Sequence, residues 1–169
     1  LELGQITSGG DSNVNIDQAK LEKAIVQYKV GSILNVAGHA LPVEKWWEII
    51  GAVQTASAKT RLKIPNIYGI DSIHGANYVR GATLFPQEIG MGATWNPILM
   101  ERAMEITAME TRAAAIPWTF SPVLDAGRQP TWARFWETFG EDTYLTKVMG
   151  VSFVRGTEGT DVSNDKRVA

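Results

Sequence analysis

Two acidic side chains directly follow apolar segments of this chain. Asp71 follows residues 64–70 (IPNIYGI), and Asp125 follows residues 118–124 (WTFSPVL). A carboxylate at the end of a buried strand can accept hydrogen bonds from two hydroxyl groups, or act as a general acid or base. Both positions are therefore candidates for binding or proton transfer. The alternative for each is a helix cap or a structural ion pair.

A polar loop rich in tryptophan follows the second of these carboxylates, over residues 126–142. Arg134 and Glu137 lie three residues apart in it, which is close enough for an ion pair on one helical turn. Such a pair can bind hydroxyl groups or simply lie on the surface. Glu141 and Asp142 are better explained as the start of a helix, because acidic groups are favourable at its positive end.

Other common catalytic arrangements are missing from the sequence. The chain has no cysteine and only two histidines, without the spacing of a zinc site, so we expect no metal. It contains no dinucleotide-binding glycine motif, P-loop or nucleophile elbow. Ser72 and Ser121 lack a convincing histidine partner, and His74 either orients the loop after Asp71 or is structural. Carboxylates, an arginine and tryptophans remain, and this set suits the cleavage of glycosides.

The composition is that of an ordinary globular protein, with 44% hydrophobic and 20% charged residues among 169. The net charge of −2 gives no electrostatic reason to expect nucleic acid or an anionic membrane as a partner. No apolar run approaches the roughly 20 residues of a membrane-spanning helix. Leu1 is not a start methionine, so we expect sequence upstream of it.

The pattern of apolar residues predicts an α/β fold in which helices alternate with three buried strands. We expect strands at residues 30–36, 64–70 and 118–124, and helices at residues 17–28, 44–60, 96–115 and 143–155. Residues 167–169 could begin a further strand. Such alternation indicates a parallel sheet, either doubly wound or part of a (β/α)8 barrel. A whole barrel needs about 250 residues, so three units are less than half of one.

Three segments of the chain stand out together: residues 69–77 (GIDSIHGAN), residues 82–97 (ATLFPQEIGMGATWNP) and residues 121–142 (SPVLDAGRQPTWARFWETFGED). In sequence and in order they resemble glycoside hydrolase family 3, the β-glucosidase and exo-glucanase family. The resemblance covers nearly the whole chain. It implies a partial (β/α)8 TIM-barrel-like domain, made of the first three βα units, with residues 1–169 as its N-terminal portion.

The resemblance also implies a function and a set of substrate-binding residues. The family hydrolyses terminal non-reducing β-D-glucosyl residues by a retaining double displacement and needs no cofactor. Asp71 aligns with the aspartate that binds sugar hydroxyls in the −1 subsite. Arg134 aligns with a sugar-binding arginine, and Glu137 with the acidic residue three positions after it. The implied partner is a β-linked oligosaccharide or glucoside.

The chain departs from the family pattern in two ways. Where the family commonly reads D-P-R-W-G-R, this chain has Gln129, Thr131 and Ala133 in place of the first Asp, the first Arg and the Gly, and keeps Arg134. The motifs of the nucleophilic aspartate and the acid/base glutamate are absent. We therefore expect no catalytic residue in this chain, which would need the rest of the barrel and a C-terminal domain to complete the site.

Two other functions remain open from the sequence. One is a non-catalytic carbohydrate-binding protein derived from the same fold. The other is a different (β/α)8 enzyme, such as an aldolase or a metal-assisted lyase, although Lys45, Lys59 and Lys63 fall on or after a helix rather than at strand ends. We expect a periplasmic or secreted protein, and a cytoplasmic one is also compatible with the sequence.

Overall fold

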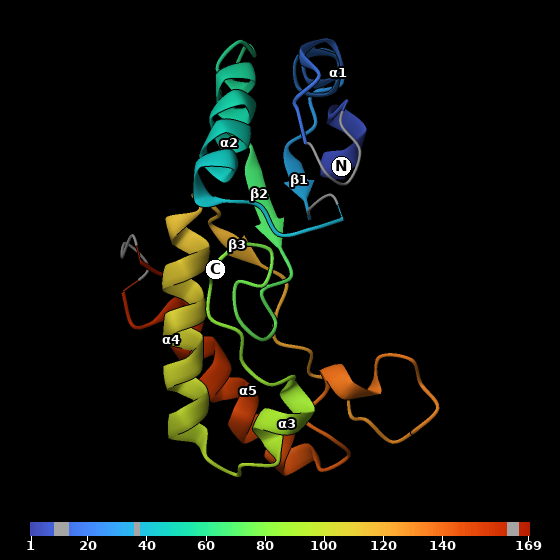
Figure 1. The fold of residues 1–169 in the computed structure, drawn as a ribbon, viewed down its shortest axis with the longest axis vertical. Helices are drawn as coiled ribbons and strands as arrows, with labels where there is room; N and C mark the ends of the chain where they lie inside the picture. The colour runs from blue at the N-terminus through green and yellow to red at the C-terminus, as the bar shows by residue number, and fades with distance from the viewer. Residues whose placement is uncertain (9–13, 36–37, 162–165) are drawn as a thin grey trace.

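The computed structural model describes residues 1–8, 14–35, 38–161 and 166–169, in which strands and helices alternate (Figure 1). The strands are β1 (Ser32–Leu34), β2 (Ile67–Ile70) and β3 (Trp118–Thr119). The α-helices are α1 (Gln18–Glu22), α2 (Val43–Ser57), α3 (Glu88–Gly92), α4 (Pro97–Ala113) and α5 (Thr143–Glu158). Short turns form η1 (Leu3–Ile6), η2 (Lys23–Gln27), which continues α1, and η3 (Phe135–Glu137). No helix in this described part combines the length and apolar character that a bilayer span requires.

The strands form one parallel sheet in the order β1-β2-β3, as the sequence predicts. Ile33 pairs with Tyr68, and Ile70 pairs with Thr119. Ala169 lies beside the other edge of β3: its N–H donates to the Pro117 carbonyl at 3.1 Å, and its carbonyl accepts from the Thr119 N–H at 2.9 Å. This is the hydrogen-bond pattern of a parallel pair. The end of the described chain therefore extends the sheet, as expected of residues 167–169.

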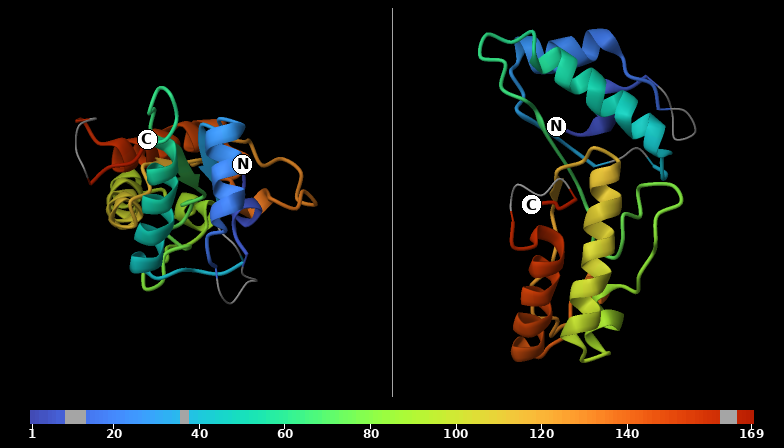
Figure 2. Two further views of the ribbon diagram at one scale, coloured as in Figure 1. Left: turned by 90° about the horizontal axis from the view of Figure 1, so that it is seen from above. Right: turned by 90° about the vertical axis from the view of Figure 1, so that its left-hand side faces the viewer.

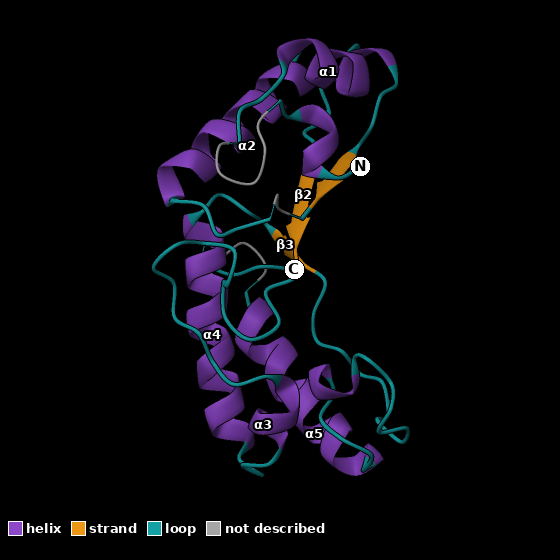
Figure 3. Cartoon of the chain, turned by 45° about the vertical axis from the view of Figure 1, so that its right-hand side comes forward, coloured by secondary structure: helices purple, strands orange, loops and turns teal. Residues whose placement is uncertain are grey.

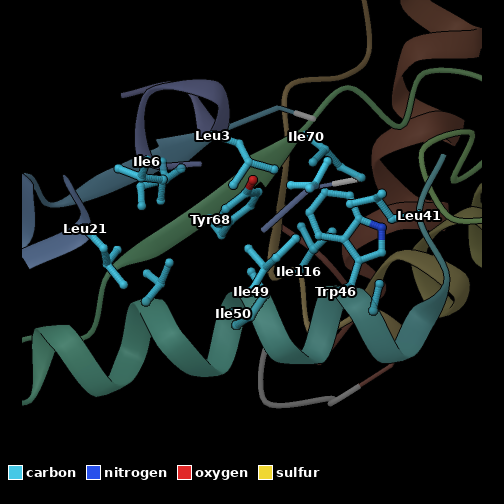
Figure 4. Close-up of a cluster of buried hydrophobic side chains, with 14 of the residues drawn as sticks. Leu3, Ile6, Leu21, Leu41, Trp46, Ile49, Ile50, Tyr68, Ile70 and Ile116 are labelled. Carbon is cyan, nitrogen blue, oxygen red and sulfur yellow. The ribbon is translucent and has the colours of Figure 1, made fainter. Parts of the chain in front are cut away.

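One face of the sheet is covered by α2, whose apolar side chains recur every three or four residues. Trp46, Ile49 and Val53 are fully buried against the sheet (Figure 4). The rings of Trp46 and Tyr68 meet edge to face with centroids 5.7 Å apart. Each such side chain contributes about 1.5–3 kcal/mol through burial. This core holds β2 rigid and thereby fixes the segment that follows it.

A second core joins α4 and α5, which lie side by side (Figure 2). Met104, Met149 and Phe153 are fully buried between them. Gly156 allows the close approach, because a Cβ atom there would lie 2.4 Å from the Glu101 carbonyl oxygen. This helix pair supports the loops that follow β2 and β3, which lead toward α3 and η3 (Figure 3).

The helix starts agree with the prediction from the sequence, whereas the strand lengths differ from it. The Asp17 and Asn96 side chains cap α1 and α4, each accepting a backbone N–H three residues later at 3.1 Å. The expected strand at residues 118–124 ends at Thr119, because Pro122 has no N–H to continue the ladder. The expected strand at residues 30–36 contains the shorter β1, and its last residue lies outside the described residues. The helix α3 was not anticipated.

Candidate functional site

A cavity of about 430 Å³, here called the strand-end pocket, opens beyond the C-terminal end of β2. Its lining residues come from the segment after β2 and from η3 or its start. The first group is Asp71, Ile73, His74, Asn77, Tyr78 and Gln87, and the second is Arg134, Trp136 and Glu137. The structure thus brings together all three residues predicted to bind substrate. Sites at the carboxyl ends of parallel strands are the rule in α/β folds.

A tightly bonded loop positions Asp71. Gly75 has φ +114°, and a Cβ atom there would lie 2.1 Å from the Thr83 carbonyl oxygen, so the turn requires glycine. The Asn77 amide, oriented so that its nitrogen donates, bonds the backbone oxygens of Asp71 and Gly75 at 3.1 Å each. Nδ1 of His74 lies 2.9 Å from the Phe85 carbonyl oxygen, as a ring N–H donor. This bond fastens the loop after Asp71 and is compatible with both interpretations of His74.

Arg134 and Glu137 form an ion pair at the opposite side of the pocket. Nε and Nη2 of Arg134 donate to the same carboxylate oxygen, Oε2 of Glu137, at 2.8 and 2.6 Å. The Glu137 side chain is only 10% exposed, whereas that of Arg134 is 59% exposed. The hydrogen bonds and then the charge of Glu137 raise the pKa of Arg134 further above its usual value, with smaller contributions from Asp71 and Asp125. Two of the five guanidinium N–H donors are thus used to fix a cation that faces the pocket.

The other acidic candidates lie outside the pocket. Asp142 caps α5, with Oδ1 accepting the Leu145 N–H at 2.6 Å, which confirms the interpretation of this position as a helix start. Asp125 is exposed and is not among the pocket-lining residues, since β3 ends well before it. Ser72 is buried, with its hydroxyl 3.0 Å from that of Thr111.

Sequence reasoning did not single out several of the residues that line the pocket, among them Tyr78, Gln87 and Trp136. Gln87 comes from the start of α3. Trp136, which lies between Arg134 and Glu137 in the sequence, lines the pocket and is 47% exposed. Burial raises the pKa of Tyr78, and the negative charge of Asp71 adds to this rise. The position of Trp136 in the charged loop was a usable signal. Nothing in the local pattern distinguishes Tyr78 or Gln87 from packing residues.

A buried glutamate underlies this region. Glu88 is fully buried, and its Oε1 accepts the Val123 N–H at 3.0 Å, which ties α3 to the segment after β3. Its Oε2 has no hydrogen-bond partner among the described residues. Burial raises the pKa of Glu88 to about 9, opposed by the Val123 hydrogen bond and assisted by the charge of Glu137. The side chain is therefore a neutral acid at pH 7.

We expect Glu88→Gln to stabilise the protein increasingly as the pH rises. Between the usual pKa near 4.5 and the folded pKa near 9, only the unfolded state ionises, so native stability falls with rising pH. The slope is at most about 1.4 kcal/mol per pH unit. Glutamine keeps the acceptor for Val123 and removes this dependence. Denaturant unfolding at pH 5 and pH 8 measures it, with the exposed Glu141→Gln as control; an equal pH dependence in all three proteins would contradict the prediction.

A larger groove of about 540 Å³ lies between Leu124 and α5. Its walls are mainly apolar, with Val151 and Val154 among them, and no acidic residue lines it. Among the described residues, no group of three His, Asp or Glu side chains is placed to hold a metal ion. The strand-end pocket is therefore the site whose chemistry matches the binding of hydroxyl groups.

Comparison with known proteins identifies the family. Residues 2–167 match the model of the glycosyl hydrolase family 3 N-terminal domain. The chain belongs to glycosyl hydrolase family 3. It is α/β, and the family 3 enzymes of similar structure build the same units into a TIM-barrel N-terminal domain, which confirms the predicted fold class.

Individual family 3 proteins extend the comparison. The chain is 41% identical over 174 residues to a lysosomal β-glucosidase of Dictyostelium discoideum, covering 98% of the chain and 21% of that protein. It is 35% identical to a periplasmic β-glucosidase of Salmonella typhimurium over 60% of the chain and 13% of that protein. A Q683A mutant of an exo-1,3/1,4-β-glucanase from Pseudoalteromonas superposes with a TM-score of 0.80 at 28% identity, covering 98% of the chain and 27% of that structure. The chain thus spans about a fifth of the length of the first of these relatives.

Proposed function

We propose that this chain forms part of the −1 sugar subsite of a β-glycosidase that hydrolyses terminal non-reducing β-D-glucosyl residues. The observation that carries the proposal is the strand-end pocket, where Asp71 and the Arg134–Glu137 pair meet around one cavity. The nucleophile and the acid/base of the retaining double displacement lie outside residues 1–169. The chain supplies binding and orientation, and the rest of the barrel and a C-terminal domain complete the site.

Each pocket residue has a role that its chemistry allows. The two oxygens of Asp71 accept hydrogen bonds from adjacent equatorial hydroxyls of the terminal glucose. Arg134 donates to a further hydroxyl, while Glu137 holds its guanidinium in one orientation. The indole of Trp136 covers an apolar face of the sugar ring. These contacts hold the ring while the anomeric carbon reacts, which lowers the entropic cost of the displacement.

The partner is a β-linked oligosaccharide or glucoside, and the chemistry requires no cofactor. The names of the relatives support this class, since they include β-glucosidases and an exo-1,3/1,4-β-glucanase. The lysosomal and periplasmic names among them support a location outside the cytosol, and we propose a periplasmic or secreted protein.

We expect that the chain alone does not hydrolyse an aryl β-glucoside, because in this proposal it carries neither catalytic carboxylate. The full-length protein should release the aglycone, and NMR should show that the first sugar product is the β-anomer. Hydrolysis by the purified 169-residue chain would contradict the absence of catalytic residues. Release of the α-anomer by the full-length protein would contradict the retaining mechanism.

A non-catalytic carbohydrate-binding protein derived from the same fold is the second candidate, and it would use the same residues of the strand-end pocket. The same experiment separates the two functions. A full-length protein that binds glucose or a β-glucoside in calorimetry but releases no aglycone would support the binding function and overturn the enzymatic one.

A further inference from the structure

The end of the sheet opposite the strand-end pocket carries a second notable surface. Two connections lie there, residues 28–31 between η2 and β1 and residues 58–66 between α2 and β2 (Figures 1 and 2). They share a shallow cavity of about 300 Å³, so they are neighbours in space. We call the side chains of these two connections the basic tip.

Three large apolar side chains of the basic tip point into solvent instead of the core. Tyr28 is 68% exposed, Leu62 is 61% exposed and Ile64 is 66% exposed. Single exposed apolar residues are ordinary on protein surfaces, whereas neighbouring ones mark contact surfaces. Leu62 and Ile64 are such neighbours, because they line the same cavity. All three belong to short connections, where polar residues are the usual choice.

The same connections carry an excess of positive charge. Lys29, Lys59, Arg61 and Lys63 are all exposed, and the two segments contain no Asp or Glu. Lys59 is bonded to Glu22 at 2.5 Å. The chain as a whole has a net charge of −2, so this local excess is hidden by the average.

The basic tip is also held in a defined shape. The Asn66 side chain donates to the Val30 carbonyl at 2.7 Å and so ties the two connections together. The Gln54 amide nitrogen donates to the Asn66 carbonyl at 2.7 Å, which fastens the longer connection to α2. The exposed cations and apolar groups are therefore presented by an ordered scaffold.

We infer that the basic tip is a docking surface for an anionic lipid bilayer. Interfacial binding takes apolar side chains that enter the headgroup region and cations that pair with anionic lipids, and the basic tip has both side by side. A soluble polyanion would use the cations but would leave Tyr28, Leu62 and Ile64 in water. Because the strands run away from the basic tip, a docked protein would keep the strand-end pocket open to solution.

The distribution of charge over the surface decides contact with a bilayer more than the net charge of −2 does. Attraction to a charged surface falls off within about 10 Å at 0.1 M salt. A bilayer that meets the basic tip therefore experiences its local cations more than the acidic groups at the far end of the sheet. The absence of a net positive charge does not argue against such a contact.

Vesicle co-sedimentation of the full-length protein tests the inference. We expect binding to vesicles of phosphatidylcholine with 30% phosphatidylglycerol, weaker binding at high salt, and little binding to phosphatidylcholine alone. Arg61→Glu with Lys63→Glu should lower partitioning at least roughly 25-fold, at roughly fivefold per cation removed. The matched control, Arg102→Glu with Lys147→Glu on α4 and α5, changes the charge equally far from the basic tip and should bind like the unmodified protein.

A second variant tests insertion separately from charge. Leu62→Ser with Ile64→Ser keeps every cation and should also weaken binding to the anionic vesicles, with circular dichroism to verify that the variants remain folded. Equal binding to neutral and anionic vesicles would overturn the inference. An equal loss of vesicle binding in the two charge-reversal variants would also overturn it. Full binding by the serine variant would overturn it as well, because it would show that charge alone is recognised.

Discussion

Replacing Asp71 with Asn in the full-length protein should lower kcat/KM for an aryl β-glucoside by on the order of 1,000-fold. The carboxylate has two acceptor oxygens and a full negative charge. The isosteric amide loses the charge and replaces one acceptor oxygen with an NH2 donor, so it can no longer accept hydrogen bonds from both hydroxyls. The loss of one hydroxyl contact is costly in a site that binds hydroxyl groups. When the sugar shifts, the other polar groups of the site also lose their hydrogen-bond partners. The loss should appear in kcat as well as KM, because a misplaced ring reacts slowly.

Asp125 provides the matched control for this experiment. It also follows a strand-and-loop segment, yet it is exposed and lies outside the strand-end pocket. Asp125→Asn makes the same chemical change and should leave kcat/KM within about threefold of the unmodified protein, as surface substitutions commonly do. If the two variants lost activity equally, the assignment of the −1 hydroxyls to Asp71 would be wrong.

The sequence predicted those parts of the fold that depend on local patterns. The alternation of apolar segments gave the parallel sheet, because buried strands and amphipathic helices have distinct periods. The caps at Asp17 and Asn96 were predictable, since a short polar side chain before a helix satisfies free N–H groups. The three-segment resemblance predicted the family. The structure brings Asp71, Arg134 and Glu137 around one pocket, and their binding of substrate stays a prediction.

The features that the sequence did not predict depend on contacts between distant segments. The end of β3 is set by Pro122 and by what lies across the sheet, so an apolar run of residues 118–124 overestimates it. Nothing in the sequence distinguishes Glu88 from a surface acid, and only its three-dimensional surroundings show that it is buried and neutral. Tyr78 and Gln87 reach the pocket because the loop after β2 folds back on itself, with His74 bonded to Phe85, and no periodic pattern in the sequence predicts this. Positions of this kind are fixed by tertiary structure alone.

Glu137→Gln should lower kcat/KM by roughly 10- to 100-fold, mainly through a higher KM. The substitution keeps the shape of the side chain but replaces a charge-assisted bond to Arg134, of a kind that contributes about 1.5–3 kcal/mol, with a neutral one. Because the Arg134 side chain is 59% exposed, its guanidinium would then sample orientations that do not face the sugar. Glu137 acts in this scheme as a positioning residue, through Arg134.

A second ion pair in the chain serves as the control. It separates the loss of Arg134 orientation from the general effect of losing an ion pair. Lys45 and Glu48 have the same three-residue spacing, with a distance of 2.8 Å, but Glu48 is 59% exposed and lies on α2. Glu48→Gln should leave kinetics unchanged, since exposed pairs contribute about 0–1 kcal/mol and this one is remote from the pocket. Glu137→Asp, which keeps the charge on a shorter side chain, should recover part of the lost affinity for substrate. A kcat/KM unchanged by Glu137→Gln would show that Arg134 is oriented by the sugar rather than by the protein.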